Sequence, residues 1–157
     1  AARLDFSQFD VTLKGFEGNP TVVFDEAKFV NLQQNGKIVE GDASVNVKDG
    51  AFLNRSNRIG TRWTDMGTAY GYANQYKQDS EMNTALYVKF TVDGRTFEKT
   101  YPINPAGITK EVDHNGIKGG YLYDIKVRWT ITPDWGDSTI EFYTRDWVHN
   151  SIPEIVL

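Results

Sequence analysis

The segment from Tyr121 to Ile131 alternates between two kinds of residue without interruption. Every second position holds a large aromatic or branched side chain, namely Tyr121, Tyr123, Ile125, Val127, Trp129 and Ile131. The positions between them hold Leu122, Asp124, Lys126, Arg128 and Thr130. Successive side chains on a strand point to opposite faces of its sheet, so a period of two predicts a long strand with one buried face.

Shorter alternating segments recur along the chain and are separated by turn signals. Leu86, Val88, Phe90 and Val92 alternate up to Asp93-Gly94, where a two-residue type I′ turn is favoured. Such a hairpin pairs Phe90 with Phe97 and Leu86 with Tyr101, which brings large side chains together on one face. Many short strands with turns between them predict an all-β fold, an antiparallel β-sandwich.

Three local patterns refine this prediction. Leu4, Phe6, Phe9, Val11 and Leu13 alternate with a phase shift at Ser7-Gln8, which indicates a β-bulge. Residues Asp25 to Phe29 are interpreted as a single helical turn. A second alternating stretch, Thr139 to Trp147, follows the turn at residues 133–137 and predicts another strand.

Composition excludes several classes of protein. A chain of 157 residues forms one domain of common size, so we expect residues 1–157 to be a single sandwich. The net charge is −4 with no block of Lys or Arg, which argues against nucleic acid as a partner. Cysteine is absent, so disulfides and thiolate sites are excluded. No apolar run is long enough to span a bilayer, and the opening Ala1-Ala2-Arg3-Leu4 predicts a processed or trimmed chain.

The stretch from Asn54 to Asn83 breaks the alternation and is predicted to be a long loop or an insertion, with room for a short strand around Thr68 to Tyr72. Its aromatic residues are Trp63, Tyr70, Tyr72 and Tyr76. Flat rings can stack on the apolar faces of sugars, so these four are candidates for ligand stacking. The alternative is that they pack at the edge or end of the sandwich, as aromatic side chains commonly do.

No catalytic residue, metal site or cofactor site is predicted. His114 lies in a turn sequence and His149 lies beside Trp147, and neither belongs to a recognised catalytic motif. Asp134 and Asp137 flank a turn, but a calcium site needs six to eight oxygen ligands. We therefore expect no enzymatic activity and no cofactor.

The chain ends in an apolar tail that needs a place to dock. Its apolar residues are Ile152, Ile155, Val156 and Leu157. An extended tail can add to an open sheet edge through main-chain hydrogen bonds while alternate side chains fill pockets. These four residues are predicted to form an assembly strand after an edge strand that begins near Ile140. The alternative is that the tail closes its own sandwich.

Three short motifs are distinctive, namely Ala1-Ala2-Arg3-Leu4-Asp5-Phe6, residues 119–127 and Asp146-Trp147-Val148. They resemble motifs of the fimbrillins, the type V pilins of Gram-negative gut and oral bacteria. The first is similar to sequences at their domain boundaries. Residues 119–127 resemble a strand with the pattern G-x-x-Y-x-I-x-V, and Asp146-Trp147-Val148 resembles their closing strand. The likeness covers the first few residues and about the last forty, and suggests a C-terminal domain, a proteolytic product or a single-domain relative.

This resemblance implies a fold and a role. Fimbrillins consist of two β-sandwich domains of the transthyretin-like, Greek-key type, and they are extracellular subunits of outer-membrane-associated fimbriae. They polymerise by strand exchange, after a protease has removed an N-terminal strand. The implied partners are other pilin subunits, together with a host or bacterial surface glycan or protein as the adhesion target.

Two functions are therefore carried forward. The first is a structural or adhesive subunit of a surface fimbria, with the tail as its assembly strand. The second is a carbohydrate-binding or surface-lipoprotein module that uses the aromatic residues of the 54–83 stretch. A hydrolase is the third and least favoured alternative.

Overall fold

The structure is a computed structural model that describes residues 2–32, 45–46, 58–72, 83–103, 116–134 and 139–146. Only the backbone is described for residues 45–46 and 139–146. Every regular element in these ranges is a strand. The strands are β1 (Ala2–Leu13), β2 (Val22–Val30), β3 (Val45–Asn46), β4 (Arg62–Gly71), β5 (Ala85–Val92), β6 (Arg95–Pro102), β7 (Tyr121–Ile131) and β8 (Thr139–Asp146).

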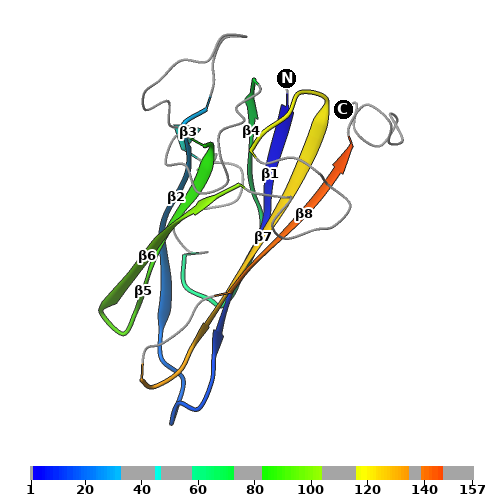
Figure 1. Ribbon diagram of the computed structural model, residues 1–157. Coiled ribbons are helices and arrows are strands. Elements are labelled where there is room, and N and C mark those ends of the chain that lie inside the picture. The colour runs from blue at the N-terminus through cyan, green and yellow to red at the C-terminus, as the bar shows by residue number, and fades with distance from the viewer. Residues whose placement is uncertain are drawn as a thin grey trace.

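The strands form two layers that pack face to face, as Figure 1 shows. The first sheet has the order β4-β1-β7-β8, and the second has the order β3-β2-β5-β6. The predicted all-β sandwich is confirmed. The first sheet is nevertheless mixed, because β1 runs parallel to β7 while its other pairs are antiparallel. The strands of the second sheet lie between β1 and β7 in the sequence, so no tight hairpin fixes their relative direction.

Aromatic rings from both sheets meet in the core. Phe9 of β1 lies 5.8 Å from Phe24 of β2 and 5.5 Å from Phe90 of β5, measured between ring centroids. Trp129 of β7 packs edge to face on Phe90 at 4.8 Å. Such tilted contacts suit the ring quadrupoles, and burial of this large apolar area is the main source of stability for the sandwich.

The alternation of β7 is confirmed. The side chains of Tyr123, Ile125, Val127 and Trp129 are buried, whereas Arg128 is exposed. Leu122 departs from the pattern, because it points away from the core and is still buried. Its register partner on β1 is Arg3, whose side chain is only 16% exposed. A long arginine stem at that position can cover apolar surface, which a single-strand pattern does not indicate.

Two bulges shape the long strands. The predicted bulge in β1 is confirmed, because the register with both β4 and β7 shifts between Phe6 and Gln8. The helical turn predicted for residues 25–29 is wrong, since these residues belong to β2. A register shift between Phe24 and Glu26 adds a residue to this strand. Buried residues therefore occur at Phe24, Ala27 and Phe29, so the period of two is interrupted between Phe24 and Ala27.

The β5–β6 hairpin is confirmed in its register and turn. Phe90 pairs with Phe97, and Leu86 pairs with Tyr101. Asp93 and Gly94 both have positive φ, at 46° and 82°, as a type I′ turn requires.

Candidate functional site

The stretch predicted as a long loop contains β4, the edge strand of the first sheet. In the described part of this stretch, ten residues form β4, which pairs with β1 on both sides of a register shift, instead of forming a loop. Backbone irregularities hid this strand, because Asp65 and Gly67 both have positive φ and the register shifts opposite Ser7. The short strand predicted around Thr68 to Tyr72 overlaps the C-terminal half of β4, which begins earlier, at Arg62.

Trp63 cannot present its ring to a ligand, because it belongs to the core. Its side chain is stacked on Phe9 with a centroid separation of 5.5 Å, and it also contacts Phe24 at 5.7 Å. Trp63 is only 6% exposed. The stacking hypothesis is therefore wrong for this residue, whose place on the inner face of β4 follows from the strand register.

Tyr70 and Tyr72 are exposed at the far end of β4. Their exposed fractions are 57% and 44%. They are two positions apart in an extended chain, which places their side chains on the same side of the backbone. Tyr76 lies outside the described residues. The structure thus retains two of the four predicted rings on its surface.

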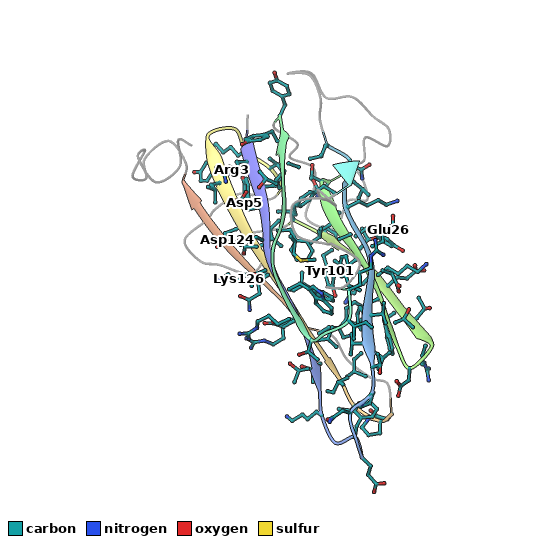
Figure 2. All side chains as sticks on the ribbon, turned by 180° about the vertical axis from the view of Figure 1, so that it is seen from behind. Arg3, Asp5, Glu26, Tyr101, Asp124 and Lys126 are labelled. Carbon is teal, nitrogen blue, oxygen red and sulfur yellow. The ribbon has the colours of Figure 1, made fainter. Side chains whose placement is uncertain are left out.

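The outer face of the first sheet carries an ordered set of polar side chains, arranged in rows across β4, β1 and β7. One row contains Arg62, Asp10 and Arg128, because Asp10 is the register partner of both arginines. Another row contains Thr68, Asp5 and Asp124. Figure 2 shows Arg3, Asp5, Asp124 and Lys126 distributed along this sheet.

Asp10 is the best-buried acid on this face and has several donors. Arg62 donates from Nε to Asp10 Oδ1 over 2.8 Å and from Nη2 to Oδ2 over 3.5 Å. Gln8 Nε2 donates to Oδ2 over 2.7 Å. Asp10 is 7% exposed. A buried carboxylate is stable only with such hydrogen-bond donors. The two bonds to Asp10 in turn hold the Arg62 guanidinium in one orientation.

The backbone before β4 brings Arg62 to this position. The chain of residues 58–61 runs beside β2, where Phe24 N donates to Arg58 O over 2.8 Å and Gly60 N donates to Val22 O over 3.1 Å. It then crosses to the first sheet, where Val11 N donates to Thr61 O over 2.8 Å. This crossing links the two sheets and places Thr61 and Arg62 next to Asp10.

A shallow depression of about 470 Å³ lies over this row. Its lining residues are Asp10, Val11, Thr12, Thr61, Arg62, Arg128 and Thr130. Further along β1, a second polar group joins the same three strands: Asp5 accepts from Arg3 Nε at 3.0 Å and from Thr68 Oγ1 at 2.9 Å, and Ser7 donates to Asp124. Neither group was predicted from the sequence, because their members come from strands far apart in the chain.

The predicted assembly strand lies outside the described residues, since they end at Asp146. The strand before it, β8, pairs with β7 and is the last strand of the first sheet. The prediction that the chain from near Ile140 forms an edge strand therefore agrees with the sheet order. The roles of Ile152, Ile155, Val156 and Leu157 stay predictions.

Within the described residues, no group of three or more His, Asp or Glu side chains is placed to hold a metal ion. His114, His149 and Asp137 lie outside those residues. None of the described segments forms a helix with the length and apolarity needed to cross a membrane.

Two tyrosines have raised pKa values for different reasons. Burial in the core raises the pKa of the Tyr123 hydroxyl well above its usual value, although this hydroxyl accepts a hydrogen bond from Lys118 N at 2.8 Å. On the outer face of the second sheet, Tyr87 donates to Glu98 Oε2 over 2.6 Å, and this bond raises the pKa of Tyr87 to about 12. Neither value supports acid–base chemistry near neutral pH.

No family model matches the sequence, and no curated protein matches it. Solved structures do resemble the fold. A "putative cell adhesion protein" of Parabacteroides distasonis is 18% identical, with a TM-score of 0.64, over 93% of this chain and 51% of that one. A protein of the same description from Bacteroides uniformis is 13% identical, with a TM-score of 0.44, over 93% and 50% of the two chains.

A fimbrial protein of Bacteroides vulgatus is 11% identical, with a TM-score of 0.38, and the match covers 92% of this chain and 54% of that one. The chain thus spans about half the length of the proteins it resembles. The likeness to the Parabacteroides distasonis structure shows a shared β-sandwich fold.

Proposed function

We propose that this chain is a structural and adhesive subunit of a bacterial cell-surface fimbria, and that its C-terminal tail is the strand exchanged between subunits. The observation that carries the proposal is the position of β8, which is the last strand of the first sheet among the described residues. The apolar tail follows it in the sequence, after residues 147–151. A chain that leaves the sandwich along a sheet edge can continue as an added strand on a neighbour.

The fold supports the same proposal. The Parabacteroides distasonis protein with this fold is described as a "putative cell adhesion protein", and the motifs at both ends of the chain resemble fimbrillins. Under this proposal the chain is extracellular, its partners are other pilin subunits, and it corresponds to one sandwich of a longer subunit. Ile155 and Leu157 share one face at a period of two, so they are the side chains that fill pockets of the acceptor.

The test compares substitutions on the two sides of the tail. We expect Ile155→Ser with Leu157→Ser to abolish assembly, whereas Val156→Ser on the opposite side leaves most of it. Assembly is measured by light scattering and electron microscopy, and the melting temperature of the monomer is measured in parallel. An unchanged melting temperature with lost assembly supports exchange between subunits.

Two results contradict the proposal. A large fall in the melting temperature of the monomer places the tail in its own sandwich. Unchanged assembly after deletion of residues 152–157 shows that the tail has no part in polymerisation.

A carbohydrate-binding module is the second candidate, and the exposure of Tyr70 and Tyr72 favours it. We expect Tyr70→Ala and Tyr72→Ala to weaken glycan binding on an array and in calorimetric titration. Tyr87→Ala, which removes a ring from the other sheet, is the matched control. Absence of binding by the intact chain would exclude this candidate.

A further inference from the structure

The row of Arg62, Asp10 and Arg128 carries a net positive charge, whereas the net charge of the whole chain is negative. The chain carries a net charge of −4, whereas this row holds two arginines and one carboxylate. β4 and β7 flank β1, so the backbones that carry the two arginines are separated by two strand spacings, roughly 10 Å. Two cationic groups therefore border the depression from opposite sides.

Arg62 is held in a defined orientation. Its Nε and Nη2 face the buried Asp10, and its side chain is still 65% exposed. A guanidinium has five N–H donors in a fixed fork, so the pairing leaves further N–H groups on the side away from Asp10. The carboxylate thus orients Arg62 without covering it, and a planar anionic group is the natural ligand for such a fork.

The rest of the lining identifies the chemical class of the ligand. Thr12, Thr61 and Thr130 also line the depression, and each of them carries a hydroxyl group. A hydroxyl donates and accepts, which matches the hydroxyl groups of a sugar. The volume of about 470 Å³ lies within the range of small-molecule sites. Two arginines are too few for the clustered basic face that nucleic acid requires.

We propose that this depression binds an acidic saccharide, with its carboxylate or sulfate held by Arg62 and Arg128 and its hydroxyls held by the threonines. Asp10 is a positioning residue for Arg62. The site is separate from the exposed tyrosines, because Arg62 and Tyr70 lie at opposite ends of β4, on the order of 25 Å apart in an extended strand.

The proposal extends the adhesive part of the proposed function and is tested on the chain as a monomer. The intact chain is titrated by calorimetry with 3′-sialyllactose, a sulfated chondroitin disaccharide, neutral lactose and a tetraglutamate peptide. We expect at least one acidic sugar to bind and lactose not to bind. The first two probes separate the carboxylate from the sulfate ester as the recognised group.

Substitutions then identify the site. Arg62→Gln and Arg128→Gln should each weaken binding by about tenfold, as expected for the loss of charged hydrogen bonds. Arg95→Gln, on the second sheet, removes the same charge and should change binding less than twofold. Circular dichroism and the melting temperature confirm that each variant is folded.

Asp10→Asn distinguishes a positioned arginine from general electrostatic attraction. This substitution raises the net charge of the chain, so nonspecific attraction of an anion should become stronger. A site in which Asp10 orients Arg62 should instead bind more weakly, by several fold. The two explanations therefore predict changes of opposite sign.

Four results overturn the proposal: no binding of either acidic sugar, equal weakening by Arg95→Gln, tighter binding after Asp10→Asn, or tetraglutamate binding as tightly as the sugars. The last result would assign the depression to an acidic protein. Deletion of residues 152–157 should leave the binding unchanged, so loss of assembly and loss of sugar binding are independent outcomes.

Discussion

Side chains on the inner face of the sandwich and on its outer face make different kinds of contact. On the inner face, Phe9, Phe90 and Trp129 pack ring against ring and are almost fully buried. On the outer face of the first sheet, Asp10 and Arg62 are joined by directed hydrogen bonds at the surface. β1 carries members of both sets, with Phe9 on the inner face and Asp10 on the outer face.

This difference separates stability from recognition. Burial of apolar area is nondirectional and large, so the inner face contributes most of the free energy of folding. An exposed ion pair contributes little, because water competes with it and its side chains lose entropy. The outer face can therefore hold a defined polar geometry, such as that around Arg62, while contributing less to the free energy of folding than the inner face does.

The largest predicted effect belongs to the inner face. Trp129→Ala should lower the free energy of unfolding by about 3–5 kcal/mol, because it removes a buried ring and leaves a cavity beside Phe90. Urea unfolding measures this change. Trp129→Phe keeps much of the volume and should cost less. A loss below about 1 kcal/mol for the alanine variant would contradict the assignment of Trp129 to the core.

The outer face should give a smaller effect. Asp10→Ala should cost about 1–3 kcal/mol, because Gln8 and Arg62 lose a nearly buried acceptor. A double-mutant cycle with Arg62→Gln measures the pair alone. Arg62 is 65% exposed, so the coupling energy should be below about 1 kcal/mol. A larger value would show that the two faces differ less than proposed.

The sequence predicted those parts of the fold that depend on neighbouring residues. The Asp93-Gly94 turn determined the β5–β6 register, and the alternation of β7 identified its buried face. Each of these signals lies within one strand or within two strands that are adjacent in the sequence. The bulges in β2 and β4 interrupted the same signal, so the strand was missed at residues 25–29 and β4 was hidden inside a predicted loop.

The candidate site could not be predicted from the sequence, for a related reason. Asp10, Arg62 and Arg128 come from three strands, and they share one row because β1 pairs with β4 on one side and with β7 on the other. No local spacing indicates either pairing. Trp63 and Tyr70 show the same limit. The sequence shows that both rings belong to this stretch, but the register of β4 decides that Trp63 faces the core and Tyr70 faces outward.

The smallest predicted effect is the change in stability at alkaline pH. It compares Tyr123, which is buried in the core, with Tyr87, which lies on an outer face. The pKa of both hydroxyls is raised in the folded chain above the unfolded value of about 10. The unfolded chain therefore loses its protons first as the pH rises. The stabilising contribution is complete below about pH 10 and declines as the pH rises toward the folded pKa, which is about 12 for Tyr87.

We expect the melting temperature to fall as the pH rises above about 10, and each Tyr→Phe substitution to remove part of that fall. Tyr123→Phe should remove the larger part, because burial is the main cause of its shift. Tyr87→Phe should remove only a small part, since the hydrogen bond to Glu98 is exposed and screened by water. Melting curves of the three proteins across this range, with phenolate absorbance as a second signal, measure both contributions. If Tyr87→Phe had the greater effect, the outer hydrogen bond would stabilise the fold more than the buried hydroxyl does, and the distinction between the faces would fail.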